Sequence, residues 1–381
     1  MSFTAIKTHG LPLLPLVIAA LLAWGVLHQW VGQGPKTPFN QVALGKSVKE
    51  VIQPVQGNRI HCQTLVDGQG CLQDWRKQGS KPVHIWLGNS QLHGINQIRP
   101  GDTTAPNHLY MRWVNKPYRL MAFSQPNANL MEHYLLFEAL LQTLPIKRLI
   151  LPVVFDDLRE EGIRPQLTSI LQDREVTPML AQTDIGQHLL SLISPDEPEK
   201  DRELSGLNQT PQKQIERFFN QHLSNHWNLW DKRSEARGQL FLKLYLFRNQ
   251  VFGITAQSKR RMIRARYLRN MEALETLLKR AAQADVEVLL YIPPIRNDVS
   301  LPYVASEYRI FKDRMRRYGA EKHIHFTSLE NLIPAQLWGF NHATNLGGEQ
   351  ELDFMHFRGA GHVQLAEAID QVITTMDGKQ P

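Results

Sequence analysis

The 381-residue chain has only two cysteines and shows no repeating sequence period and no low-complexity tract. The absence of a period argues against solenoids, propellers and other repeat architectures. Two cysteines without further ligands at zinc spacing argue against a structural zinc site. The rest of the composition, 42% hydrophobic and 21% charged, is typical of a globular protein long enough for one large domain or two ordinary ones.

One apolar run is long enough to cross a membrane. Leu11 to Val31 is apolar apart from His28 and Gln29 near its end, and about 20 helical residues span a hydrocarbon core of about 30 Å. Lys7 precedes the run, and no Ala-x-Ala cleavage site clearly follows it. We predict that residues 1–31 form an uncleaved signal anchor in the cytoplasmic membrane, which places the remainder in the periplasm or another extracytoplasmic space. A cleaved signal peptide and a buried core helix are the alternatives.

The two cysteines, Cys62 and Cys71, flank a turn-rich connection, Val66–Gly70. Such a connection brings two Cα atoms within bridging distance, and export supplies the oxidising compartment that a disulfide needs. We predict a Cys62–Cys71 disulfide that clips a small hairpin within an extracytoplasmic stalk, residues 32–80. Two unpaired thiols are the alternative.

The formal net charge of +7 favours anionic partners such as acidic glycans, lipid headgroups or nucleic acid. Nucleic acid is disfavoured as a partner because the predicted anchor exports the chain. The densest basic run is expected to be a solvated helix face, with contact to acidic glycan or membrane phosphates as the alternative. It comprises Lys259, Arg260, Arg261, Arg264, Arg266 and Arg269.

Strands and helices alternate over residues 81–165 and 260–381. This alternation predicts βαβ units, a parallel sheet and an α/β fold. The expected strands are Val83–Leu87, Tyr118–Phe123, Arg148–Phe155, Val286–Ile292 and His323–Thr327, and the expected helices include Asn127–Leu144, Met262–Ala284 and Tyr303–Tyr318. Residues 166–259 interrupt the pattern and are predicted to be a helical insertion, which either covers a site or only adds packing helices.

Polar residues follow three of these strands, and ligands of parallel sheets collect at the carboxyl ends of strands. Ser90 comes after the first strand, Asp156 and Asp157 after the third, and Asp353 and His356 lie in a polar loop after the fifth. A serine activated by a histidine, which a carboxylate orients, forms a nucleophilic triad. We predict Ser90 as nucleophile, His356 as base and Asp353 as the orienting carboxylate. Taken separately, the Ser90 segment is compatible with a simple turn and the Asp353 segment with a helix-start loop.

These residues resemble a known family. Gly88-Asn89-Ser90-Gln91 is similar to the first sequence block of the SGNH (GDSL-type) hydrolase superfamily, and Asp353-Phe354-Met355-His356, followed by Gly361-His362, is similar to its last block. The resemblance covers roughly Val83 to Met376, without the insertion. It implies a flavodoxin-like three-layer α/β/α sandwich, a serine nucleophile, and ester chemistry with no metal or organic cofactor.

The two middle blocks of the family are poorly matched. Where the family has a glycine whose N–H serves the oxyanion hole, this chain has Ser124-Gln125-Pro126-Asn127-Ala128-Asn129. Where the family has an asparagine amide, this chain has Asp156, and an ionised carboxylate there would raise the barrier. Ser90, Asn127 and Asn129 are the candidate oxyanion donors, while Asn89, Asp156 and Asp157 are predicted to line the site without an assigned role.

The anchor and the order Ser, Asp, His resemble membrane-anchored D-alanyl transfer proteins and exported polysaccharide O-acetyltransferases. The resemblance implies a carbohydrate or cell-envelope glycan as substrate and a multispanning membrane acyltransferase as partner. The competing interpretations are a catalytically inactive scaffold that binds glycan or such a partner, and a lipase-like enzyme.

The remaining histidines carry weaker patterns. His323 and His325 alternate on a strand but have no carboxylate or cysteine at ligand spacing, so zinc is disfavoured. His362 is expected to pack at a helix start, and His93 lies near Ser90 without an assigned role.

Overall fold

The structure, a computed structural model, describes residues 47–62, 65–192, 243–341 and 350–378. The chain divides into two compact units, one of residues 1–43 with 198–250 and the other of residues 44–197 with 251–381. Of the first unit, residues 243–250 are described and are helical. All elements named below belong to the second unit.

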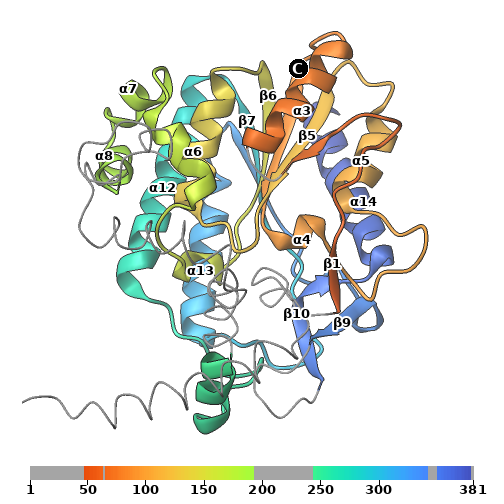
Figure 1. Ribbon diagram of the computed structural model, residues 1–381, viewed down its shortest axis with the longest axis vertical. Coiled ribbons are helices and arrows are strands. Elements are labelled where there is room, and N and C mark those ends of the chain that lie inside the picture. Colours follow the sequence, from red (N-terminus) through yellow and green to blue (C-terminus); the bar gives the residue numbers. More distant parts are fainter. Residues whose placement is uncertain (1–46, 63–64, 193–242, 342–349, 379–381) are drawn as a thin grey trace, which may run out of the picture. The chain divides into compact units, whose positions relative to one another are not determined.

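The second unit is built around a six-stranded parallel sheet (Figure 1). Its spatial order is β2-β5-β3-β6-β7-β8. The last five strands follow the order 2-1-3-4-5 in chain terms, which is compatible with a flavodoxin-like fold that has an added edge strand, β2. The strands are β2 (His61–Cys62), β3 (Val83–Gly88), β5 (Arg119–Ser124), β6 (Ile146–Pro152), β7 (Glu287–Ile292) and β8 (Ile324–Ser328).

Helices cover both faces of this sheet. Alternate side chains of each strand point to opposite faces, and the two resulting cores divide β3 accordingly, with Ile85 and Leu87 in one core and Trp86 in the other. The first core includes α3 (Leu65–Lys77), α6 (Leu130–Leu141), α12 (Arg264–Gln283) and α13 (Ala305–Tyr318). The second includes α5 (Ala105–Trp113) and α14 (Gly359–Gly378), on the other side in Figure 1.

Two short antiparallel ribbons lie outside the main sheet. One pairs β1 (Val48–Glu50) with β4 (Gly94–Asn96), and the other pairs β9 (Trp338–Asn341) with β10 (Glu351–Phe357). β4 follows α4 (Ser90–His93), and β4 contacts both β9 and β10. The ribbons therefore bring β9 and β10, which follow the last strand of the sheet, close to α4 and β4, which follow β3.

The five expected strands are confirmed with ends displaced by a few residues, but the expected stalk is wrong in its second half. The Cys62–Cys71 disulfide is present, with a Cα–Cα distance of 6.7 Å. It joins the edge strand β2 to α3 rather than closing a hairpin. The sheet thus starts at His61, before the expected boundary at residue 81, because two residues are too few to produce a recognisable strand pattern.

Residues 166–192, the first described part of the insertion, pack on the sheet domain. It contains η2 (Pro165–Gln172), α7 (Val176–Leu180) and α8 (Asp184–Ser191). Buried side chains from these elements, such as Leu167, Leu180 and Leu189, belong to the first core. This part contributes packing. Residues 193–242, the middle of the predicted insertion, lie outside the described residues.

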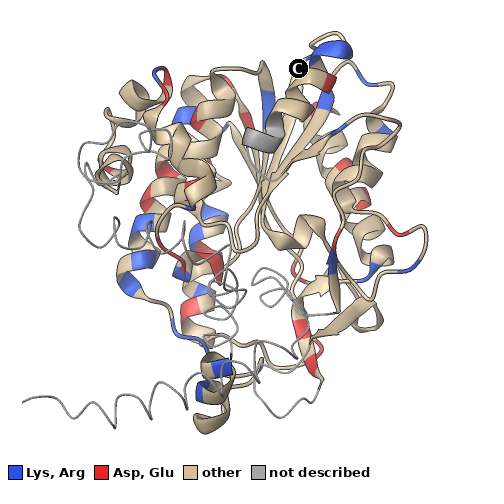
Figure 2. Cartoon of the chain, in the orientation of Figure 1, with Lys and Arg blue, Asp and Glu red and all other residues tan. Residues whose placement is uncertain are grey.

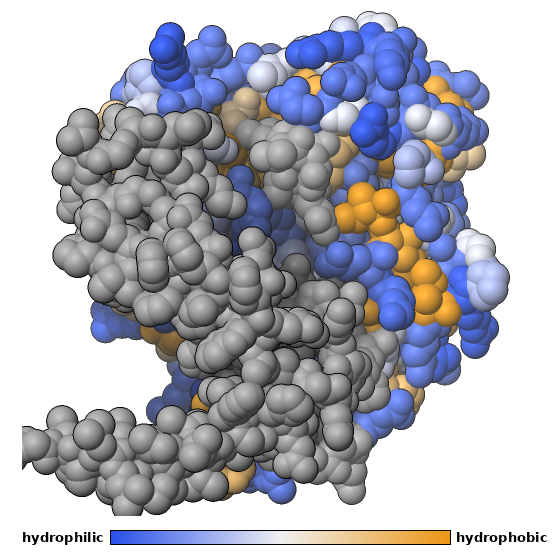
Figure 3. Space-filling view, viewed as in Figure 1, coloured by the Kyte–Doolittle hydropathy of each residue, from blue (hydrophilic) through white to orange (hydrophobic). Residues whose placement is uncertain are grey.

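The described surface in Figure 3 is mainly hydrophilic, with one apolar area on the side of α5 and α14. Met111 of α5 is 45% exposed. Within the described ranges, no helix combines the length and apolarity needed to span a bilayer. The predicted anchor, residues 1–31, lies outside these ranges.

Candidate active site

Ser90 lies at the carboxyl end of β3, at the first position of α4. Asn89 caps this short helix by accepting a hydrogen bond from the Gln91 N–H at 3.0 Å. Gly94 ends the turn, and a Cβ there would lie 2.7 Å from the Ser90 carbonyl oxygen and 3.0 Å from Cδ2 of His356. A side chain at position 94 would therefore push apart the segments that carry the serine and the histidine.

Asp353 and His356 belong to β10, whose pairing with β9 is interrupted between Leu352 and Phe357. The expected loop is therefore a bulged strand. The bulge turns the Asp353 carboxylate back, where Oδ1 accepts the N–H groups of Met355 and His356 at 2.9 Å each. These bonds fix the carboxylate beside the His356 ring.

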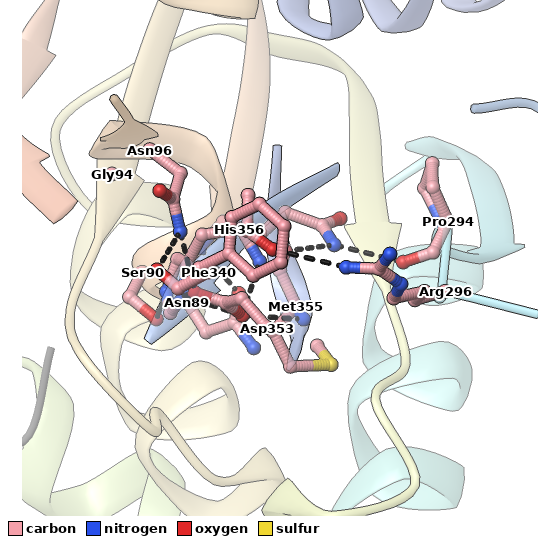
Figure 4. Close-up of polar contacts among 12 residues, drawn as sticks. Asn89, Ser90, Gly94, Asn96, Pro294, Arg296, Phe340, Asp353, Met355 and His356 are labelled. Carbon is pink, nitrogen blue, oxygen red and sulfur yellow. Dashed lines mark hydrogen bonds and ion pairs between the residues drawn. The ribbon is translucent and has the colours of Figure 1, made fainter. Parts of the chain in front are cut away.

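The three predicted triad side chains form a continuous chain of hydrogen bonds (Figure 4). Nδ1 of His356 lies 3.0 Å from Asp353 Oδ2, and Nε2 lies 2.9 Å from Ser90 Oγ. Ser90 and His356 are 6% and 8% exposed. The hydroxyl and the imidazole are 266 positions apart in the sequence and lie within the reach needed for direct proton transfer.

The electrostatics favour an ionised Asp353. Burial alone raises the pKa of this carboxyl, but the His356 ring and the N–H groups of Met355 and His356 offset burial and lower the pKa. An ionised Asp353 accepts a hydrogen bond from the Nδ1–H of His356. Nε2 of His356 is then the acceptor for the Ser90 hydroxyl.

Two supporting residues were not identified from the sequence. Asn96 donates from Nδ2 to Asp353 Oδ2 at 2.9 Å and to the Phe340 carbonyl at 3.0 Å. Gln91 donates from Nε2 to the carbonyls of Pro294 and Met355, each at 2.8 Å. These amides join α4 and β4 to β10 and to the end of β7. An isolated Asn or Gln has no local pattern that reveals such a role.

The charge of Asp156 is compensated by two arginines. Its carboxylate forms ion pairs with Arg159 and Arg260. Asp157 is the buried carboxyl, and it accepts a hydrogen bond from Asn89 Nδ2 at 2.7 Å. Burial raises the pKa of Asp157 well above its usual value, with Asp156 and Glu160 adding to the effect. The Asn89–Asp157 contact spans the boundary between β3 and β6, the topological switch point of this strand order.

In the loop after β5, Asn129 makes mainly structural contacts. Its Oδ1 accepts from the Glu132 N–H and its own N–H donates to Glu132 Oε2, which forms a capping box at the start of α6. Its Nδ2 also donates to the Gly162 carbonyl at 2.9 Å. The backbone N–H of Asn129 is therefore engaged in the helix cap.

Asn127 remains the loop's candidate donor. The Gln125 N–H donates to the Gly88 carbonyl and the Ala128 N–H to the Gln125 carbonyl, and Pro126 has no N–H. Among the described loop residues, Asn127 is thus the one whose backbone donor has no assigned hydrogen bond. Its φ of +52° is the left-handed conformation, which asparagine tolerates better than most residues.

His362 and His323, two of the weaker sequence candidates, make structural contacts. His362 accepts from the Ala105 N–H and contacts the Gly94 carbonyl, each at 3.2 Å, so it joins the start of α14 to α5 and β4. Burial lowers its pKa to about 3. His323 contacts the Leu278 carbonyl at 3.3 Å. Within the described ranges, no group of His, Cys, Asp or Glu side chains has the arrangement of a metal site.

Half of the basic run around the start of α12 is paired with acidic side chains, and blue and red segments alternate along this part of Figure 2. Arg260 pairs with Asp156, and both Arg266 and Arg269 pair with Glu161. These three arginines join the start of α12 to the segment after β6.

Comparison with known proteins does not assign this chain to a family. No protein-family model matches the sequence, and a search of curated proteins gives no significant match.

Proposed function

We propose that this protein is a serine esterase or O-acyltransferase of the SGNH type, with Ser90 as nucleophile. The observation that carries the proposal is the hydrogen-bonded chain Asp353–His356–Ser90, with distances of 3.0 and 2.9 Å between its reacting atoms. The strand order and the helices on both sheet faces support the flavodoxin-like sandwich that this family implies.

The geometry supports a two-step acyl transfer. His356 Nε2 takes the Ser90 proton as Oγ attacks the carbonyl carbon of an acyl ester, and a tetrahedral intermediate forms. The ester C–O bond then breaks, the alcohol leaves with the proton from His356, and the acyl group remains on Ser90. An acceptor hydroxyl gives its proton to His356 and attacks the acyl carbon. The bond to Ser90 Oγ then breaks, and His356 returns the proton to Oγ. Water as acceptor gives hydrolysis, and a glycan hydroxyl gives transfer.

Backbone donors complete the oxyanion hole in this proposal. Ser90 is the first residue of α4, so its N–H has no acceptor within the helix. Asn127 contributes the second N–H. These neutral donors replace the missing asparagine amide, and the ion pairs of Asp156 keep its charge from opposing the developing oxyanion.

The substrate class rests on the predicted export of the chain. We propose an extracytoplasmic carbohydrate or cell-envelope glycan as acceptor, and a multispanning membrane acyltransferase as the partner that supplies the acyl group. The Cys62–Cys71 disulfide supports an oxidising compartment. The N-terminal anchor in the cytoplasmic membrane stays a prediction from the sequence.

The test uses an aryl acetate and a fluorophosphonate probe on the full chain. We expect Ser90→Ala and His356→Ala to lower kcat by about 10⁴-fold or more, and Ser90→Ala to abolish labelling. Ser328→Ala is the matched control, because Ser328 is another serine at the carboxyl end of a strand of the same sheet and donates to Glu330 at 2.8 Å. It should retain full activity.

An inactive wild-type protein that also fails to react with fluorophosphonate would contradict the proposal. That result would support the competing interpretation, a catalytically inactive scaffold that binds glycan or a membrane partner.

A further inference from the structure

A second cluster of serine and histidine lies next to the triad. Ser124, the last residue of β5, has its Oγ 2.5 Å from Nε2 of His61 and 2.7 Å from Nδ1 of His93. All three side chains are buried, with exposures of 1%, 3% and 0%. The triad uses none of them, so the cluster calls for a separate explanation.

The cluster is electrically neutral, and its two hydrogen bonds run in a defined donor-to-acceptor order. Burial lowers the pKa of His61 to about 3 and places the pKa of His93 well below its usual value. Each neutral ring has one N–H, and a serine hydroxyl has one proton to donate. One imidazole therefore donates to Ser124 Oγ, and the Ser124 hydroxyl donates to the other. Both contacts are satisfied only when the hydroxyl lies between the two rings.

The three residues come from three different elements. His61 belongs to the edge strand β2, Ser124 to β5, and His93 to α4, the helix that starts with Ser90. Ser124 is also the register partner of Gly88, two residues before Ser90. The hydroxyl thus ties the end of β5 to the helix of the nucleophile.

The loop that follows Ser124 is held at a second point. Arg164 donates to Gln125 Oε1 at 2.9 Å and to the Pro126 carbonyl. Its charge is balanced by the buried Glu132, 3.1 Å away. Asn127 lies between this clamp and the capping box at Asn129, so its left-handed backbone is fixed on both sides.

We propose that Ser124 is a positioning residue, which holds the loop carrying Asn127 at a fixed distance from Ser90 through its hydrogen bonds to His61 and His93. This inference rests on the proposed function, because the position of the loop affects the reaction only if an oxyanion forms at Ser90. Loss of the hydroxyl leaves two buried imidazoles without a shared partner and frees the end of β5 from α4. Since an oxyanion donor acts on the transition state, kcat changes while KM does not.

The experiment compares Ser124→Ala, Ser124→Thr and Ser328→Ala with the wild-type chain, using the aryl acetate. We expect Ser124→Ala to lower kcat by about 10- to 100-fold, with KM unchanged within about twofold. Ser124→Thr keeps a hydroxyl and should recover most of the lost kcat. Ser328→Ala should match the wild type.

His61 provides an independent variant, because it contacts Ser124 from β2 and lies outside α4. His61→Leu should reduce kcat as Ser124→Ala does, whereas His61→Gln places a polar atom near the position of Nε2 and should recover activity. Thermal melts identify any variant that fails to fold, and the His61 pair then decides the question.

The outcomes separate the two proposals. An active wild type in which Ser124→Ala and His61→Leu both match Ser328→Ala would overturn the positioning role and leave the proposed function intact. A wild type with no turnover and no labelling at Ser90 would overturn the proposed function, and the positioning role with it.

Discussion

At the scale of single residues, Asn127 is distinguished by its backbone conformation, with a φ of +52°. Glycine occupies left-handed backbone at little steric cost. Asparagine is one of the few other residues that adopt this conformation readily. In the proposed function, Asn127 supplies the backbone N–H that a glycine supplies in the SGNH pattern.

Substitution of Asn127 tests this explanation. Asn127→Gly should leave kcat within about threefold of wild type, because the N–H and the backbone conformation are both kept. Asn127→Val should lower kcat and the melting temperature, since a β-branched residue at positive φ costs at least about 1–2 kcal/mol. Steady-state kinetics and thermal melts measure the two effects. Equal activity of the Val and Gly variants would contradict a role for this backbone.

Asp353 offers a second residue-scale prediction. Asp353→Asn should reduce kcat by about 10⁴-fold with little change in KM, because an amide cannot hold the His356 tautomer that accepts from Ser90. Asp370→Asn is the matched control, as Asp370 accepts a hydrogen bond from Trp113 at 2.7 Å on α14. A similar loss in both variants would indicate a general effect on folding.

At the scale of elements, the disulfide fixes a strand too short to be stable by itself. β2 has two residues and pairs only with β5, through His61 with Ala122 and Cys62 with Phe123. The bond from Cys62 to Cys71 anchors this strand to α3. It therefore also supports the position of His61 beside Ser124.

Reduction should lower the free energy of unfolding by about 2–3 kcal/mol, as expected for a cross-link that closes a loop of about ten residues. Urea unfolding with and without dithiothreitol measures the difference. The double variant Cys62→Ser with Cys71→Ser should be as unstable as the reduced protein and insensitive to the reductant. A midpoint unaffected by reduction would contradict this role.

At the scale of the whole molecule, buried histidines dominate the expected pH dependence of stability. Burial lowers the pKa of five of them, His61, His84, His93, His133 and His362. They stay neutral in the folded state, while the unfolded chain takes up protons below a pKa of about 6.5. Stability is therefore lost as the pH falls below about 6.5 toward the lowered folded pKa values, which are about 3 for His61, His133 and His362. The raised pKa values of Glu132, Glu138 and Asp157, caused mainly by burial, act in the opposite direction.

Because five groups oppose three, we expect the free energy of unfolding to fall by at least about 2 kcal/mol between pH 7 and pH 5, the effect of one such histidine. Urea unfolding at a series of pH values measures this. His133→Gln should reduce the slope, whereas His323→Gln, at a side chain that is 27% exposed, should not. A stability that is flat or rises toward pH 5 would refute the expectation.

Local patterns in the sequence determined much of the architecture. The apolar run of β6 and the apolar periodicity of α12 predict a strand and a helix, because burial on one or both faces determines which neighbouring residues are apolar. The Ser90 and Asp353–His356 segments were recognisable because each follows an expected strand and resembles a sequence block of the SGNH superfamily. The expected pairing of Cys62 with Cys71 followed from their spacing.

Only the tertiary structure decided the surroundings of these segments. The ion pair of Asp156 with Arg260, the hydrogen bond from Asn129 to Gly162, and the contacts of Asn96 and Gln91 depend on groups far away in the sequence. The same holds for Ser124, whose two histidines lie 63 and 31 positions away. The periodicity of apolar residues indicates which face of an element is buried. The identity of one polar side chain does not indicate its hydrogen-bond partner, because that partner is brought near by long-range packing.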